Sequence, residues 1–232
     1  MNRSFLSPGR RRIAAACLVL APLLFTTAEF LTPQSDGTPG ELLDALAAAG
    51  PTATMGLAAT LLSSLLFVPG LFGLLSRPMR RGTAIADAGL ALLYYGLVAN
   101  VALVGLNVMF VAMADPAMDR VAMVALFERM THETTIVIPL LAGHYLMAAG
   151  ALLLGLGLWR GGVGPRWAAV AVGLAGVTDA LLGSVGLEEV GSVVSNALLV
   201  CGFVAYAWLL LHERAEAPIE NAAAMPAATM AG

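Results

Sequence analysis

Six long apolar stretches recur along the chain, and a short polar segment separates each from the next. A helix needs about 20 mostly apolar residues to cross a hydrocarbon core that is ~30 Å thick. Most of these stretches are too long for buried strands, so they predict transmembrane helices. The predicted spans cover residues 13–31, 54–76, 84–113, 135–159, 167–187 and 191–211. The pattern therefore predicts an all-α integral membrane bundle of six transmembrane helices.

Two of the connecting segments also carry a helical pattern. Residues 40–50 and 118–131 are rich in helix formers, and apolar positions in the second segment recur at three- and four-residue spacing. We therefore expect two short helices on the outer surface of the membrane. Residues 215–232 are rich in Ala, Pro and Met and show no periodicity, which predicts a disordered cytoplasmic tail. The remaining residues, 1–214, are expected to form a single transmembrane domain.

Arginine is distributed unequally over the predicted loops. Ten of the twelve arginines lie in the N-terminal segment, the second and fourth loops and the tail, whereas Arg120 and Arg129 lie in the third loop. Cytoplasmic loops carry the excess of basic residues in multi-pass proteins, so both termini are predicted to be cytoplasmic. The first stretch also resembles a signal peptide, with a weak cleavage motif at residues 26–28. Its apolar run is long for a signal sequence, so we expect it to remain in the chain.

The composition narrows the class of protein further. Hydrophobic residues make up 59% of the chain and charged residues only 12%, whereas soluble domains carry about 25% charged residues. The net charge is −3, so nothing indicates a nucleic-acid partner. The absence of lysine together with abundant Ala and Gly fits a GC-rich bacterial genome, so we expect a multi-pass protein of the bacterial cytoplasmic (inner) membrane. Cys17 and Cys201 lie in apolar stretches without the spacing of a metal or redox site, so neither a metal nor a cofactor is expected.

A small set of polar residues falls inside the predicted spans. Ionisable groups at membrane depth are costly, so each is a candidate for function. Depth follows from the rise of about 1.5 Å per residue, which places Glu29 almost at the interface and Asn100 deepest. The other four lie at a similar depth in the outer half of the membrane: Asn107, His144, Asp179 and Asn196.

These four residues have two interpretations. They form a polar cavity open to the outside, in which His144 and Asp179 bind a small polar or cationic ligand or exchange a proton with it. Alternatively, they form hydrogen bonds between helices, each worth about 0.6–2 kcal/mol.

The sequence carries no recognisable catalytic motif. The segment 183–186 has the wrong residue order for an intramembrane serine protease, and His132 lies too far from His144 to share a haem or zinc site with it. We therefore predict a non-catalytic protein of the lipid bilayer with a ligand-binding cavity. A small transporter or permease subunit is the alternative, followed by an unrecognised intramembrane enzyme. A homo-oligomer or a complex with a partner membrane protein also remains open.

The turn between the fourth and fifth predicted spans carries the most distinctive motif. A glycine-rich span beginning near Gly143 leads into residues 159–167, with the sequence WRGGVGPRW, and then into the small-residue stretch 173–176. In this order of elements, the chain resembles the bacterial membrane family called domain of unknown function 4386. The likeness in layout covers roughly residues 10–214. The resemblance implies a six-span membrane fold and carries no activity with it.

Overall fold

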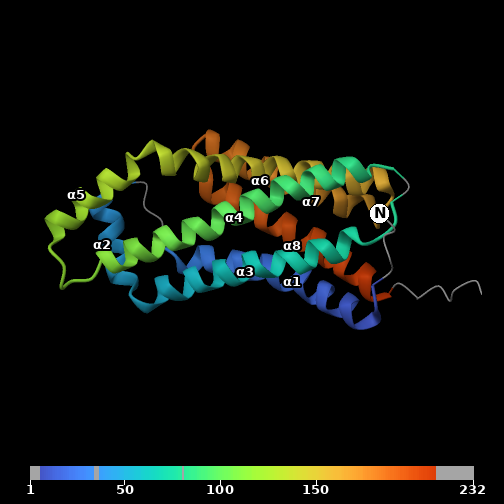
Figure 1. Ribbon diagram of the computed structural model, residues 1–232, viewed down its shortest axis with the longest axis horizontal. Helices are drawn as coiled ribbons and strands as arrows, with labels where there is room; N and C mark the ends of the chain where they lie inside the picture. Colours follow the sequence, from blue (N-terminus) through green and yellow to red (C-terminus); the bar gives the residue numbers. More distant parts are fainter. Residues whose placement is uncertain (1–5, 34–36, 80, 213–232) are drawn as a thin grey trace, which may run out of the picture.

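The computed structural model describes residues 6–33, 37–79 and 81–212 (Figure 1). Within the helices it describes the side chains of all residues except 134, 136, 137, 179, 180, 183, 184, 188 and 189. The described part is entirely helical apart from its turns, which confirms the prediction of an all-α protein. The predicted disordered tail, residues 215–232, lies outside the described residues.

Eight α-helices lie in the described part of the chain. They are α1 (Pro8–Leu31), α2 (Pro39–Ala49), α3 (Pro51–Leu75), α4 (Thr83–Met113), α5 (Arg120–Thr131), α6 (Thr134–Gly161), α7 (Arg166–Ser184) and α8 (Glu188–His212). Each predicted span coincides with one long helix, and the two additional predicted helices coincide with α2 and α5.

Five of these helices are long and apolar enough to cross a membrane: α1, α3, α4, α6 and α8. In α7, the apolar stretch within the fully described residues is shorter and covers Arg166–Thr178. The structure therefore agrees with a helical, multi-pass membrane bundle, while the sixth span and the orientation in the membrane stay predictions.

Six helices form a closed ring in chain order. Each of α1, α3, α4, α6, α7 and α8 packs against the next, and α8 packs back against α1 (Figure 1). The contact between α4 and α6 is the most extensive of the six, and that between α3 and α4 is the least extensive. The ring therefore brings the first and last long helices of the chain side by side.

Close packing of α4 against α6 depends on glycine. Gly89 and Gly96 are seven residues apart on α4 and face Gly150 and Gly143 of α6. A Cβ atom on Gly89 would lie 2.4 Å from the backbone nitrogen of Leu154 and 2.8 Å from the carbonyl oxygen of Gly150. A Cβ atom on Gly96 would lie 2.9 Å from the carbonyl oxygen of Gly143. Small residues allow membrane helices to approach this closely, so the glycines set the distance between the two helices.

The short helices α2 and α5 cover one end of the ring, which we call the capped end. Their apolar side chains pack with residues from the adjoining ends of α3 and α4, and the rings of Phe110 and Phe127 are 4.3 Å apart. Arg120 of α5 forms an ion pair with Asp44 of α2 at 2.5 Å and also donates to the carbonyl oxygen of Gly40. The two helices therefore form one small layer with its own apolar core.

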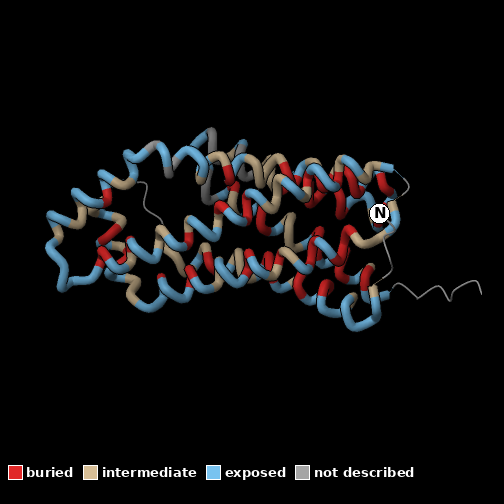
Figure 2. The backbone as a smooth tube through the Cα atoms, in the orientation of Figure 1, coloured by how far each residue is buried: buried red, intermediate tan, exposed pale blue. Residues whose placement is uncertain are grey.

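The larger apolar core fills the opposite half of the ring. It is built from the start of α1, α4 and α7 and from the end of α3, α6 and α8, with fully buried residues such as Leu18, Leu74, Leu158 and Leu210. Figure 2 shows the buried residues concentrated in the half of the bundle nearer the N-terminus. A cavity inside the ring adjoins this core, since Phe67, Leu71 and Phe203 belong both to the core and to the cavity wall.

Candidate functional site

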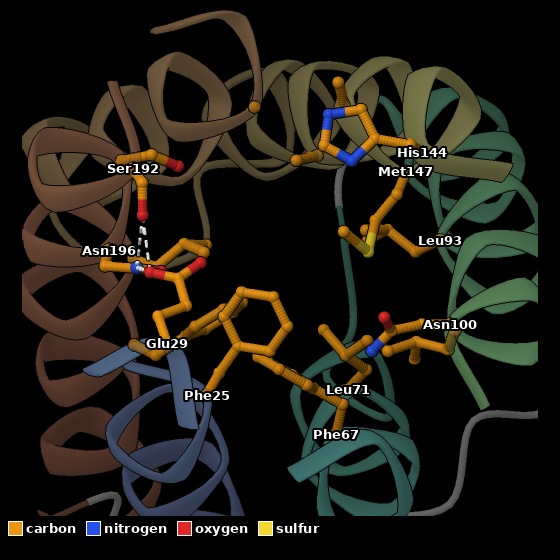
Figure 3. Close-up of a pocket in the computed structure, with 17 residues that line it drawn as sticks. Phe25, Glu29, Phe67, Leu71, Leu93, Asn100, His144, Met147, Ser192 and Asn196 are labelled. Atoms are coloured by element: carbon orange, nitrogen blue, oxygen red, sulfur yellow. Dashed lines mark hydrogen bonds between the residues drawn. The ribbon is translucent and has the colours of Figure 1, made fainter. Parts of the chain in front are cut away.

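A cavity of about 240 Å³ lies inside the ring, and all six ring helices contribute residues to its wall (Figure 3). Small-molecule sites typically measure about 300–1,000 Å³, so a cavity of this size suits a small ligand. Seventeen residues line it: Phe25, Glu29, Phe67, Leu71, Leu93, Leu97, Asn100, His144, Met147, Ala148, Ala151, Gly176, Ser192, Ser195, Asn196, Leu199 and Phe203.

Polar and apolar residues occupy different ends of the cavity. On α8, which begins at the capped end, the polar residues Ser192, Ser195 and Asn196 come first, and the apolar residues Leu199 and Phe203 follow. With a rise of about 1.5 Å per residue, Ser192 and Phe203 lie roughly 16 Å apart along the helix. The α8 wall is therefore polar toward the capped end and apolar toward the other.

The other helices repeat this order. Glu29 is near the end of α1 that leads into α2, and Asn100 lies closer than Leu93 to the end of α4 that leads into α5. On α6, which follows α5, His144 precedes Ala151. Each polar residue thus lies on the capped side of the apolar residues of its helix. The cavity as a whole has a polar end and an apolar floor.

The carboxylate of Glu29 is held by hydrogen bonds from α8. The hydroxyl of Ser192 donates to it at 2.5 Å, and the side-chain amide of Asn196 donates to the same oxygen (Figure 3). The amide of Asn196 also lies 3.4 Å from the hydroxyl of Ser192. Asn196 is only 4% exposed, and hydrogen bonds to a carboxylate are stronger than those between neutral groups. These bonds fix α1 to α8 at the polar end of the cavity.

Two further polar residues lie across the cavity from Glu29 (Figure 3). The amide of Asn100 donates to the hydroxyl of Ser64 on α3 at 3.1 Å, and the hydroxyl of Ser64 donates to a backbone carbonyl of its own helix. His144 is exposed, and its ring meets that of Tyr145 edge-on at 5.7 Å between centroids. The wall formed by α4 and α6 therefore adds an amide and an imidazole to the carboxylate on the opposite side.

The structure brings together only part of the site that the sequence predicts. His144 and Asn196 line the cavity, as expected for a shared site. Asn107 is half-buried and is not among the lining residues, because it lies two turns beyond Asn100 toward the capped end. The side chain of Asp179 lies outside the described residues.

Glu29, Asn100 and Ser192 line the cavity, although the sequence analysis left all three out of the predicted site. Glu29 lies two residues before the end of α1, so its position suggested an interfacial charge, but its side chain lines the cavity. A usable signal was present, because α1 ends and α8 begins at the same end of the ring. A carboxylate near the end of α1 and two polar side chains near the start of α8 are therefore candidates for a contact.

Comparisons with known proteins identify no relative. No protein-family model, curated protein or solved structure matches this chain. The resemblance to domain of unknown function 4386 therefore stays a prediction, and function has to be inferred from the cavity.

The chemistry of the cavity favours binding by charge and hydrogen bonds. Within the described residues, His, Cys, Asp and Glu side chains form no group of three or more that could hold a metal ion. Cys17 is buried within the bundle and Cys201 is exposed on α8, and neither lines the cavity. The groups that remain available are a carboxylate, amides, hydroxyls and an imidazole above an apolar floor, which suit an amphipathic molecule.

Proposed function

We propose that this chain is a non-catalytic protein of the bacterial cytoplasmic membrane that binds a small amphipathic molecule with a cationic head group. It crosses the membrane six times with both termini in the cytoplasm, so the capped end faces outward. The head group lies at the polar end of the central cavity, and the apolar part of the ligand extends toward the floor. The resemblance to domain of unknown function 4386 supports this location and adds nothing on the ligand.

The separation of polar and apolar lining residues carries the proposal. Glu29 supplies a negative charge at the polar end, and a cation there gains an attraction that is strong in a site of low dielectric constant. Phe67, Leu71 and Phe203 form the floor, where an alkyl group gains about 0.8 kcal/mol for each buried methylene. A purely polar ligand would leave the floor uncovered, and a purely apolar one would gain nothing from the charge of Glu29.

Equilibrium binding to purified protein in nanodiscs tests the proposal. The probe is radiolabelled octyltrimethylammonium, and the matched control is the neutral analogue in which carbon replaces the quaternary nitrogen. We expect saturable binding of the cation and at least about tenfold weaker binding of the neutral analogue, because only the charge differs. Equal binding of the two probes would contradict the assignment of a cationic head group.

Glu29→Gln locates the site. Glutamine has the same length as glutamate, and its carbonyl oxygen can still accept from Ser192 and Asn196, so the variant is expected to fold. Binding of the cation is expected to weaken at least about tenfold. The matched control is Glu128→Gln, which removes the same charge from the exposed surface of α5 and leaves Kd unchanged. An unchanged Kd for Glu29→Gln would place the ligand elsewhere.

Transport is a second candidate function, favoured by prolines in two of the helices that carry polar groups. Pro22 lies seven residues before Glu29 on α1, and Pro139 lies five residues before His144 on α6. Secondary transporters often have interrupted helices beside their binding sites. Uptake into proteoliposomes separates the two functions: protein-dependent accumulation of labelled octyltrimethylammonium indicates transport, and saturable binding without accumulation indicates a binding protein.

A further inference from the structure

A groove on the outside of the ring shares two residues with the central cavity. The groove measures about 350 Å³ and is lined only by α1 and α8. Glu29 and Asn196 line both the groove and the cavity. Their hydrogen-bonded side chains therefore lie at the boundary between the interior of the ring and its outer surface.

The rest of the groove is apolar and turned outward. Phe30 is 76% exposed and Val193 is 54% exposed, and Cys201 is exposed on the same side. In a membrane, such side chains face the hydrocarbon of the lipids. Because Glu29 itself lines this outward-facing groove, its side chain lies between the interior of the ring and the lipid-facing surface.

The seam between α1 and α8 differs from the other five seams of the ring. A segment of chain connects the two helices at every other seam, whereas α1 and α8 are the first and last helices of the described residues, and within residues 6–212 no loop joins one directly to the other. The α3–α4 seam is less extensive, but a short loop of the chain joins its two helices directly. Separation of α1 from α8 therefore stretches no connection.

We propose that the α1–α8 seam is a lateral portal through which a cationic amphiphile passes between the bilayer and the central cavity. The inference rests on the proposed function and adds the route and the source of the ligand. An amphiphile in a bilayer holds its head group at the interface, and Glu29 lies two residues from the end of α1, at that level. The head group replaces the amide of Asn196 as the partner of the carboxylate, so the group that closes the portal also receives the ligand.

A reversible cross-link across the seam tests the portal. The helices α1 and α8 are antiparallel, and Glu29 of α1 pairs with Asn196 of α8. Leu23 lies six residues before Glu29 and Cys201 lies five residues after Asn196, and both line the groove. Leu23→Cys places a second thiol opposite the native Cys201 in the wall of the groove. Oxidation then locks the seam and reduction frees it in the same molecules, which provides a matched control without any change of sequence.

The measured quantity is the rate at which octyltrimethylammonium, preloaded into nanodisc lipid, binds to the protein. The oxidised protein is expected to bind at least about tenfold more slowly, because the disulfide closes a route that requires separation of the helices. The reduced protein is expected to bind at the wild-type rate. Wild type, which has only Cys201 in the groove, and the double variant Leu23→Cys/Cys201→Ser, which has only the new thiol there, are treated with the same oxidant and are expected to show the wild-type rate.

A second variant covers the case in which the disulfide does not form. Ala197 is exposed and lines the groove but not the cavity, so Ala197→Trp fills the portal from outside. Its control is Val194→Trp, an exposed position on the same helix that lies outside the groove. We expect slow association for Ala197→Trp and the wild-type rate for Val194→Trp.

The outcomes separate the portal from the proposed function. Slow association in the locked or filled protein, with Kd unchanged after long incubation, supports a lateral portal. Wild-type rates in both would overturn the portal while leaving the binding site intact, and would indicate access from water at the capped end. An absence of saturable binding in the reduced protein and in wild type would overturn the proposed function itself.

Discussion

The side-chain amide of Asn196 donates a hydrogen bond to the carboxylate of Glu29, although the two residues are 167 positions apart in the sequence. The bond joins the last long helix of the chain to the first and closes the ring at its polar end. Because Asn196 is nearly buried and its partner is a carboxylate, this contact combines a structural role with a position in the candidate site.

Removal of the amide is expected to destabilise the bundle. Asn196→Ala leaves the carboxylate with one donor fewer, so the free energy of unfolding should fall by about 1–2 kcal/mol. The measurement is reversible unfolding of the purified protein in detergent. Asn107→Ala is the matched control, since Asn107 is half-buried and lines no part of the cavity, and its effect is expected to stay within about 0.5 kcal/mol. Equal losses for both variants would show that the contact with Glu29 adds no stability.

The glycine contact between α4 and α6 gives a second prediction. Gly89→Val places new atoms against the backbone of Leu154 and Gly150, which cannot move without separating the helices. The free energy of unfolding is expected to fall by about 1–3 kcal/mol or more. Gly105→Val is the control on the same helix, because nothing lies within 4 Å of a Cβ atom built at Gly105. Thermal unfolding of the two variants in the same detergent gives the comparison, and similar midpoints would mean that the seam adapts to the larger residue.

The layer formed by α2 and α5 is expected to depend on its apolar core and only weakly on its ion pair. Phe127→Ala removes a buried ring that packs on Phe110 and is expected to cost about 3–5 kcal/mol of stability in this layer. Asp44→Asn breaks the pair with Arg120, in which the side chains are 77% and 37% exposed, and is expected to cost less than about 1 kcal/mol.

Hydrogen exchange of α2 and α5 measures both changes. Phe127→Ala is expected to increase exchange in both short helices while the ring helices keep their protection. Asp44→Asn is expected to exchange like wild type at high salt, where the pair is screened. Faster exchange in Asp44→Asn than in Phe127→Ala would mean that the ion pair, and not the apolar core, holds the layer.

Most of the fold could be predicted from the sequence because each long helix carries its own signal. An apolar stretch such as residues 84–113 is long enough by itself to identify a helix, whatever it contacts. The short helices were also predictable, since α5 combines an apolar face with Asp119, which caps its start by accepting from the backbone of Val121 at 3.0 Å. The arrangement of helices was not predictable, because every long helix presents apolar and small residues on several sides.

The site was predicted only in part, for a related reason. Depth along a helix follows from counting residues, and it correctly grouped His144 with Asn196. Rotation about the helix axis decides whether a residue faces the ring interior, and the sequence does not contain that information for a helix that is apolar all round. Glu29 shows the consequence, since its position near the end of α1 indicated an interfacial charge and did not show that the side chain faces the cavity. Asn107 shows that depth also misleads, because it shares a helical face with Asn100 but lies two turns beyond it and is not among the lining residues.

Labelling of single cysteines tests the orientation on which the outward-facing polar end depends. In a background with Cys17→Ala and Cys201→Ser, Glu128→Cys places a thiol on the exposed surface of α5, and Pro78→Cys places one in the exposed loop between α3 and α4 at the opposite end of the ring. Ten arginines lie in segments assigned to the same side as that loop, so the excess of basic residues should hold it in the cytoplasm. A membrane-impermeant maleimide applied to intact spheroplasts is therefore expected to label position 128 and to spare position 78, and lysis is expected to make both reactive. The reverse pattern would turn the polar end of the cavity toward the cytoplasm, and labelling of both positions before lysis would require an even number of spans between them, so that α4 would not cross the membrane.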